Sequence, residues 1–138
     1  MQWKRQAGLA LLVAAVGGTA LYFPRSKPVV TGPDGTTVQE IASCSGELPS
    51  DQQEKVDSVR VEQTQLIVQV LANAECGPFS AEAPSARTEG DTVSLGWSWV
   101  LPKDAPVAAC ICTRRLEFRV PNAGTINRPK VVISKGVR

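Results

Sequence analysis

The chain has no histidine, and its only methionine is the initiator, Met1. Without histidine there is no Ser–His or Cys–His pair and no side chain that transfers protons readily near neutral pH. The imidazole and thioether ligands typical of exported copper sites are missing as well. No glycine-rich phosphate loop follows a strand-like segment. We therefore predict that the protein is not an enzyme and has neither a cofactor nor a metal site.

Carboxylate pairs are the one common acid–base arrangement that this composition leaves open. Acidic residues are close together in sequence at 51–57 and at 89–91. Both segments are polar and turn-like, and solvated carboxylates are the ordinary expectation in such sequence. These residues therefore do not change the prediction.

Residues 7–23 contain no charged side chain and lie between a short basic start and a stop at Pro24. This is the layout of a signal peptide or of a signal-anchor helix. Small residues before a cut after Ala20 favour cleavage, whereas the aromatic pair Tyr22 and Phe23 favours retention at the membrane interface. We expect a single-pass protein of the inner or cell membrane with an exported C-terminal domain. Cleavage near Ala20 would instead give a periplasmic or secreted protein.

The chain divides into three predicted parts. Residues 1–27 are the signal-anchor or signal peptide, residues 28–37 are a tether that ends in a Pro-Asp-Gly turn, and residues 38–138 are the extracytoplasmic domain. A domain of roughly 100 residues can bury a single hydrophobic core. Turn-forming residues are frequent at 77–90 and 122–129, and we expect a surface loop at each.

The net charge of +2 conceals two segments of opposite charge. Residues 28–113 have a net charge of −8, and residues 114–138 have one of +6. We expect these charges to meet across the strands of one sheet. The alternative is that the basic segment contacts lipid headgroups or an acidic protein, and the candidate contact residues are then Arg114, Arg115 and Arg119. An exported domain without a basic–aromatic cluster is not expected to bind nucleic acid.

Alternation with a period of two predicts the fold class. Residues 92–99 place Val93, Leu95, Trp97 and Trp99 on one face and small residues on the other, as in a half-buried strand. Further strands are predicted at 59–61, 66–72 and 110–120, with weaker candidates at 38–42 and 131–134. The only helical indication in this region is a single turn at 50–56. After the N-terminal transmembrane or signal helix we expect an all-β domain, a small antiparallel β-sandwich or partial barrel of about six strands.

The tryptophans and Arg114 in these strands could serve either packing or binding. Trp97 and Trp99 share a face with apolar residues, so we favour the core over an exposed aromatic platform for binding. We expect Val93, Leu95 and Trp97 to be buried with Leu116 and Phe118. Arg114 interrupts the apolar positions of 110–120. It marks a bulge, an end of the core or a contact site, and a bulge is the simplest of the three explanations.

The four cysteines, Cys44, Cys76, Cys110 and Cys112, form the strongest pattern. An even number in an exported domain predicts disulfides. Side chains two apart on a strand are about 6.5–7 Å apart, whereas a disulfide needs Cβ atoms about 3.8 Å apart. Cys110 and Cys112 should therefore each pair with Cys44 or Cys76, and both cross-pairings remain open. A metal site built from all four thiolates is the less favoured alternative, because zinc ligands are usually spaced further apart than Cys-x-Cys.

These observations favour a non-enzymatic, membrane-tethered β-sandwich module outside the cytoplasm. We expect it to bind a protein partner of unknown identity as an accessory component of an envelope or cell-surface assembly. The alternative is a soluble periplasmic inhibitor or immunity-type protein that blocks an enzyme. A soluble inhibitor would lose its leader, so retention of residues 1–20 separates the two hypotheses.

Overall fold

The computed structural model describes residues 26–44, 48–49 and 51–134. The predicted signal peptide or signal-anchor lies outside the described residues, apart from its last two positions. Within the described ranges, no helix is long and apolar enough to cross a membrane.

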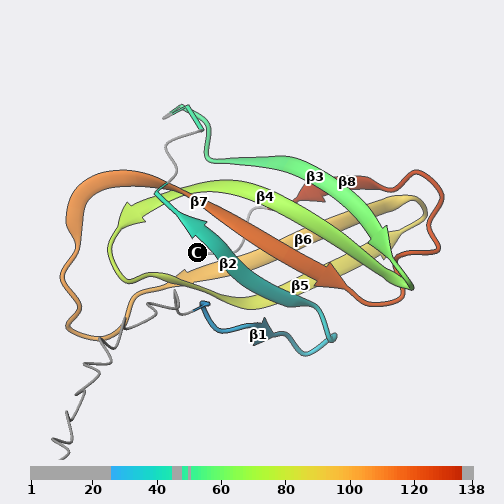
Figure 1. Cartoon of the computed structure of the whole chain (residues 1–138), viewed down its shortest axis with the longest axis horizontal. Helices are drawn as coiled ribbons and strands as arrows, with labels where there is room; N and C mark the ends of the chain where they lie inside the picture. The colour runs from blue at the N-terminus through green and yellow to red at the C-terminus, as the bar shows by residue number, and fades with distance from the viewer. Residues whose placement is uncertain (1–25, 45–47, 50, 135–138) are drawn as a thin grey trace, which may run out of the picture.

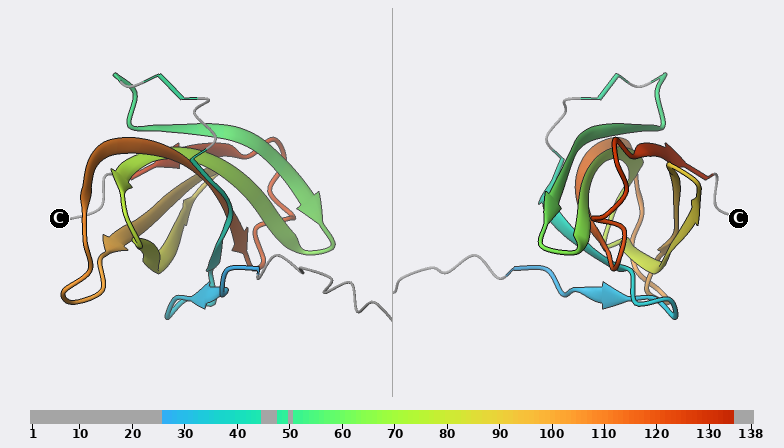
Figure 2. Two further views of the ribbon diagram at one scale, coloured as in Figure 1. Left: turned by 60° about the vertical axis from the view of Figure 1, so that its left-hand side comes forward. Right: turned by 90° about the vertical axis from the view of Figure 1, so that its right-hand side faces the viewer.

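In the described part of the chain, eight strands form two sheets that enclose one core (Figures 1 and 2). The larger sheet has the order β1-β2-β7-β4-β3, with β1 at Val30–Thr31, β2 at Thr37–Ser43, β7 at Ala108–Val120, β4 at Gln65–Cys76 and β3 at Glu54–Glu62. The smaller sheet has the order β5-β6-β8, with β5 at Ser80–Glu89, β6 at Thr92–Val100 and β8 at Lys130–Ile133. The predicted all-β class is confirmed for the described part of the chain.

We had expected a purely antiparallel sandwich. The structure differs from this prediction, because β8 runs parallel to β6. The two strands are far apart in sequence, and β7 lies between them in the chain but in the other sheet. The connection at 121–129, which contains the loop predicted at 122–129, leaves β7 and crosses to the smaller sheet. It brings β8 alongside β6 in the same direction, a pairing that only a crossover connection permits.

The predicted loop at 77–90 is wrong, because most of it forms β5. Ala81 and Pro84 are buried on the core side of this strand, but alanine and proline do not give a clear hydrophobic alternation. A bulge between Glu82 and Ser85 accommodates Pro84. Proline is tolerated at such a position because β5 is an edge strand.

Two smaller expectations also differ from the structure. The helical turn predicted at 50–56 is replaced by a short turn and the start of β3 at Glu54. The Asn73 side chain donates to the carbonyl oxygens of Pro49 and Gln52 and thereby holds this turn against β4. The predicted tether is partly inside the sheet, since β1 pairs with the start of β2. The Pro-Asp-Gly turn between them is present, with Gly35 at a φ of 83°.

The core lies between the inner faces of the two sheets. Phe118 of β7 packs against Trp97 of β6, with ring centroids 5.3 Å apart, and Trp99 contacts Trp97 edge to face. The five residues that we expected to be buried together all belong to this cluster: Val93, Leu95, Trp97, Leu116 and Phe118. The core interpretation of the tryptophans is therefore confirmed for Trp97, while Trp99 is partly exposed at the margin.

The outer face of the larger sheet also contains two buried apolar residues. Ile67 on β4 lies between Arg60 on β3 and Arg119 on β7. Leu71, further along the same face of β4, lies between Lys55 and Arg115 in the same way. The aliphatic stems of long basic side chains can cover such residues while their charged ends remain in water.

Candidate functional site

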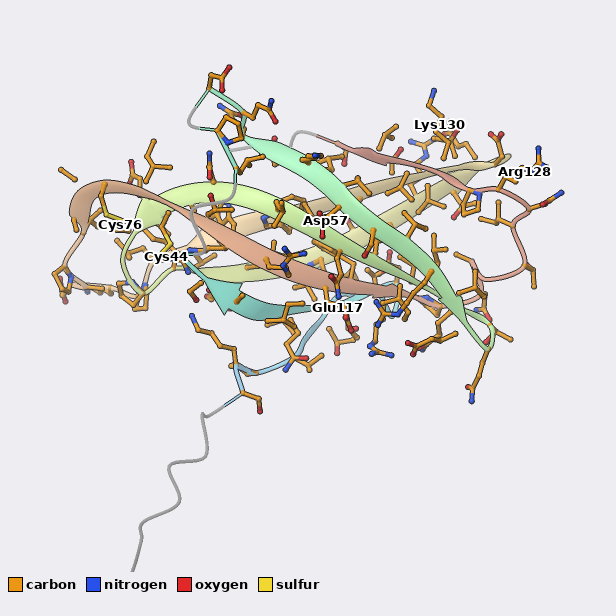
Figure 3. All side chains as sticks on the ribbon, turned by 45° about the horizontal axis from the view of Figure 1, so that its top comes forward. Cys44, Asp57, Cys76, Glu117, Arg128 and Lys130 are labelled. Atoms are coloured by element: carbon orange, nitrogen blue, oxygen red, sulfur yellow. A yellow bond between two sulfur atoms is a disulfide. The ribbon has the colours of Figure 1, made fainter. Side chains whose placement is uncertain are left out.

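Two disulfides lie at one end of the sandwich, where β7 begins. Cys44 is bonded to Cys112 and Cys76 to Cys110, with Cα–Cα distances of 4.6 and 5.3 Å. This confirms that Cys110 and Cys112 each take a distant partner and settles which one. All four sulfurs are in disulfides, so the alternative four-cysteine metal site does not form. In the described ranges no group of three or more His, Cys, Asp and Glu side chains could hold a metal ion. Figure 3 places this cystine end opposite Arg128 and Lys130.

The two cysteines of β7 differ in burial. Cys112 is buried, whereas Cys110 is exposed, although both were predicted to point inward from one strand. The first residues of β7 extend past the core, and the register with β4 shifts between Glu75 and Cys76. A shared direction along a strand therefore does not give equal burial at the end of a sandwich.

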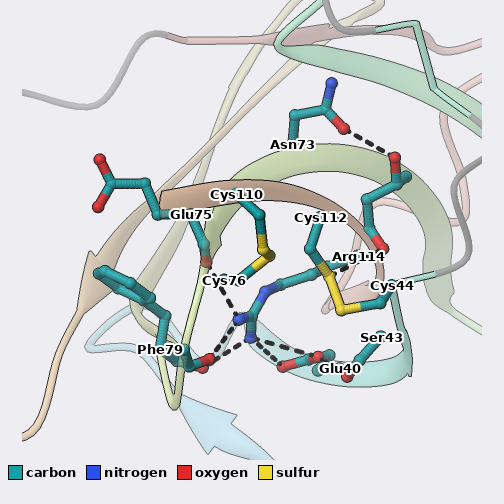
Figure 4. Close-up of a disulfide and its surroundings, with 12 residues drawn as sticks. Glu40, Ser43, Cys44, Asn73, Glu75, Cys76, Phe79, Cys110, Cys112 and Arg114 are labelled. Atoms are coloured by element: carbon teal, nitrogen blue, oxygen red, sulfur yellow. Dashed lines mark hydrogen bonds and ion pairs between the residues drawn. A yellow bond between two sulfur atoms is a disulfide. The ribbon is translucent and has the colours of Figure 1, made fainter. Parts of the chain in front are cut away.

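Arg114 lies between the two disulfides and forms a buried ion pair with Glu40 (Figure 4). The Arg114 Nη1 is 3.2 Å from the Glu40 Oε2, and the two side chains are 3 % and 5 % exposed. Glu40 also accepts hydrogen bonds or ion pairs from Lys27 and Ser43. A buried carboxylate with several donors is compensated for the loss of water.

The other contacts of Arg114 fasten the connection between β4 and β5. Its guanidinium donates to the carbonyl oxygens of Gly77 and Phe79, at 2.6 and 2.9 Å. It also lies over the Trp99 ring, 5.5 Å from the ring centroid, in a cation–π arrangement. Nε of Arg114 is the one buried side-chain polar atom without a partner among the described residues. One side chain thus ties the two sheets together where the chain passes from one to the other.

This geometry explains why the sequence pattern breaks at Arg114. The register of β7 with β4 is regular there, and the bulge is in β2 between Glu40 and Ala42. A bulge therefore does lie beside Arg114, but in the neighbouring strand β2, and Arg114 itself lies buried at the end of the core. The side chain is buried and bound internally, so it does not lie on a surface that a partner can reach.

Arg115 and Arg119, the other two predicted contact residues, lie on the outer face of the larger sheet. Arg115 is paired with Asp57 of β3. Arg119 is paired with Glu117 on its own strand and with Glu62 on β3. The opposite charges of the acidic and basic segments thus meet across β4, which confirms our expectation for the sheet.

Glu117 is the centre of this charged network. Burial alone would raise the pKa of the Glu117 carboxyl. Hydrogen bonds from Gln69, Arg60 and Arg119 outweigh burial, so the pKa of Glu117 lies below the ordinary glutamate value. The Arg60 hydrogen bond lowers the pKa of Glu62 as well. The network therefore remains charged at neutral pH.

The four sheet edges differ in how far they are protected. β1 has two residues and β8 has four, which is too short for extensive pairing. β5 contains Pro84 and a bulge, and its Ala86 N–H donates to the Asp34 Oδ2 at 2.8 Å. β3 has nine residues, and no strand of the described chain pairs with its outer side. Its only irregularity is a bulge between Val56 and Ser58.

The regular part of β3, from 58 to 62, has no ladder partner on its outer side, and β8 of the smaller sheet lies close to β3. Glu62 pairs with Gln65 across a two-residue turn, so this closing pair is a hydrogen-bonded one. The alternation then directs the backbone N–H and C=O groups of Val59 and Val61 away from β4. Their side chains are 40 % and 49 % exposed. The two valines lie opposite the buried Val68 and Leu66, so their half-exposed side chains are on the inner face of the sheet, and Val61 lies beside Gly124 of the connection to β8.

Strand alternation at 59–61 was visible in the sequence, but the open edge was not. A valine that alternates with charged residues predicts a half-buried strand, whatever its place in the sheet.

Comparisons of the chain with protein-family models, with curated proteins and with solved structures found no match.

Proposed function

We propose that this chain is a non-enzymatic, membrane-tethered β-sandwich module that binds a partner protein along β3. In this proposal it serves as an accessory component of an envelope or cell-surface assembly. The observation that carries the proposal is the nine-residue edge of β3, unpaired within the described chain, where Val59 and Val61 are exposed. Proteins recognise such edges by adding an extended segment as a further strand.

The edge can supply both affinity and selectivity. Backbone hydrogen bonds at Val59 and Val61 would give affinity, and their side chains would add apolar contact. The bulge at Val56 limits regular pairing to about five residues of the partner, because a bulge disrupts the ladder locally. The neighbouring network of Arg60, Glu62 and Arg119 would favour a partner segment with complementary charges.

The proposed location rests on the leader and on the disulfides. Residues 7–23 are apolar, uncharged and preceded by a basic start. Two disulfides in one small domain are typical of an oxidising compartment. We therefore place the domain outside the cytoplasm, with the leader retained as a single-pass anchor.

The edge proposal can be tested by crosslinking in membranes of the source organism. A photo-crosslinking amino acid at Val61 should give one adduct of defined mass. The same residue at Thr88, exposed on β5, should give none. Val59→Pro removes an N–H that points away from β4, so it should abolish the adduct without breaking the sheet. Val59→Thr keeps that N–H and should retain the adduct.

The outcomes separate an edge contact from other contacts. Equal adducts at positions 61 and 88 would indicate collisional crosslinking and contradict binding along β3. An adduct that persists in Val59→Pro would mean that the backbone edge is not used. Circular dichroism of both variants would verify that the fold is intact.

The alternative function is that of a soluble inhibitor. The small residues that precede a possible cleavage site after Ala20 favour this alternative. N-terminal sequencing of the mature protein distinguishes the two functions. A chain that begins at Leu21 would support the inhibitor and exclude the tether.

A further inference from the structure

The charged network on the outer face of the larger sheet ends at β3 with groups of both signs still in water. Arg60 and Glu62 form an ion pair on β3, yet their side chains are 42 % and 46 % exposed. Each also pairs with a residue of β7, Arg60 with Glu117 and Glu62 with Arg119. Opposite charges on neighbouring strands stabilise a sheet. A strand added beyond β3 would therefore meet one cation and one anion in a fixed order.

The backbone of β3 is available at the same place. The N–H and C=O groups of Val59 and Val61 point away from β4, and no strand of the described chain pairs with them. Gly124, in the connection before β8, lies beside a methyl group of the Val61 side chain. Figure 2 shows the end of β3 at the margin of the ribbon in both views. The Gly124 contact therefore involves a side chain of β3 and leaves its outward backbone groups without a ladder partner.

Two copies of β3 can pair antiparallel in only a few registers. Outward backbone groups must face outward groups, so the two-fold axis between the copies has to be centred on one residue. An axis at Arg60 places two arginines opposite each other, and an axis at Glu62 places two glutamates opposite each other. Like charges directly opposite destabilise a sheet. An axis at Val59 brings Val61 against the bulge between Val56 and Ser58, which disrupts the ladder.

An axis at Val61 satisfies both the charges and the backbone. Arg60 of each copy then lies opposite Glu62 of the other copy, so the favourable pair forms twice. The Val61 residues exchange backbone hydrogen bonds across the axis, and their half-exposed side chains meet on the inner face. The Gln63 N–H points outward, because the Glu62 carbonyl on the same peptide faces β4, and it can donate to Val59 of the other copy. Residues 59–63 are thus self-complementary in this one register.

We propose that the partner of β3 is a second copy of this chain, paired antiparallel about a two-fold axis at Val61. This inference rests on the use of the β3 edge in the proposed function, and it adds the identity and the register of the partner. In the pair, the larger sheets of the two copies join into one continuous sheet. A five-residue pairing is small for a protein interface, so we expect a reversible dimer, and the full chain in its own membrane is the material to test.

Charge reversal on one copy at a time tests the register. Two full-length copies with different tags are expressed together, and capture of one tag is scored for the other. Arg60→Glu or Glu62→Arg, each present in both copies, should lower co-capture by about fivefold or more, because two cross-strand pairs become repulsive. Arg60→Glu in one copy with Glu62→Arg in the other should restore co-capture, since both cross-strand pairs are again opposite in charge. The ion pair within a strand cannot give this rescue, because each copy then carries two like charges.

The matched control is the exposed Arg87–Glu89 ion pair, which has the same spacing on β5. Arg87→Glu and Glu89→Arg, alone or mixed, should leave co-capture unchanged. Co-capture that survives both reversals at 60 and 62 would show that the copies associate elsewhere and would overturn the inference. Failure of the mixed copies to regain it, or an equal response at 87 and 89, would overturn the register as well.

Photo-crosslinking at Val61 separates this inference from the proposed function. An adduct with the mass of two chains supports both. An adduct with another protein, together with no co-capture of the two tags, would keep the use of the β3 edge but overturn the second copy. Absence of any adduct would overturn both. If circular dichroism shows that a charge reversal unfolds the chain, Val61→Lys replaces it. Two lysines at the axis should abolish co-capture, whereas Thr88→Lys on β5 should not.

Discussion

Arg114 and Glu40 form a buried ion pair that joins β7 to β2 at the end of the core, with Nη1 and Oε2 3.2 Å apart. The pair lies between two disulfides and contacts the connection that leads from one sheet to the other. A buried pair of this kind is weak as a source of net stability, but loss of one partner leaves an uncompensated charge. Its main effect here is to fix how β2, β7 and the connection between β4 and β5 meet.

Replacing Arg114 by methionine should therefore destabilise the domain strongly. We expect Arg114→Met to lower the free energy of unfolding by about 3–5 kcal/mol, because the Glu40 carboxylate stays buried with fewer donors. Adding Glu40→Leu should recover much of that loss, since both charges are then gone. Arg87→Met, in an ion pair whose side chains are 80 % and 68 % exposed, should change the free energy by less than about 0.5 kcal/mol. Urea unfolding measures all three, and additive effects at 114 and 40 would contradict the coupling.

The two disulfides should differ in their contribution and in their reactivity. Paired Cys→Ala changes should cost roughly 2–5 kcal/mol each. The Cys44–Cys112 bond closes the longer segment, with a sequence separation of 68 against 34. Because of loop-closure entropy, removal of the Cys44–Cys112 bond should lower the free energy of unfolding by about 0.6 kcal/mol more than removal of the other bond. Because Cys110 is exposed and Cys112 is buried, a mild reductant should open Cys76–Cys110 first. Alkylation and peptide mapping would detect this, and simultaneous reduction of both bonds would contradict it.

Phe118→Ala should leave a cavity against Trp97 in the middle of the core. We expect the free energy of unfolding to fall by about 3–5 kcal/mol, as for other buried phenylalanines. Ile111→Ala, on the same strand but 62 % exposed, should be close to neutral and serves as the control. Chemical unfolding provides the measurement. Equal effects at the two positions would contradict the burial described for β7.

Asp34 should make stability depend on pH under acidic conditions. Burial acts to raise the pKa of Asp34, but hydrogen bonds from the N–H groups of Ala86 and Thr36 outweigh it and lower the pKa below 3.8. The contribution of the ionised Asp34 to the free energy of unfolding is therefore complete above pH 3.8. It is lost as the pH falls through the pKa that Asp34 has in the folded state.

We expect Asp34→Asn to cost about 1 kcal/mol at neutral pH, because an amide replaces a charged acceptor of two backbone bonds. The difference from the unchanged chain should shrink below pH 3.8. Urea unfolding across this pH range is the measurement. Asp51→Asn, in an exposed turn, is the matched control. The free energies of unfolding of Asp34→Asn and of the unchanged chain could instead differ by the same amount at every pH. That result would show that the charge of Asp34 is not involved.

Much of the fold could be predicted because it depends on local spacing. Alternation with a period of two identifies β4, β6 and β7 and the face of each that enters the core. The distance between Cys110 and Cys112 on one strand excludes their mutual disulfide. Where the alternation is hidden by small residues and a proline, as in β5, the prediction of a loop is wrong.

The sequence by itself determined the strand faces, the class of disulfide pairing and the separation of charge along the chain. Only the tertiary structure decided that Arg114 meets Glu40, that β8 lies parallel to β6 and that β3 has no ladder partner on its outer side. These features depend on which strands become neighbours across long separations in sequence. Side-chain periodicity determines the direction in which a residue points, but it carries no information on strand order, and strand order decides what each residue meets.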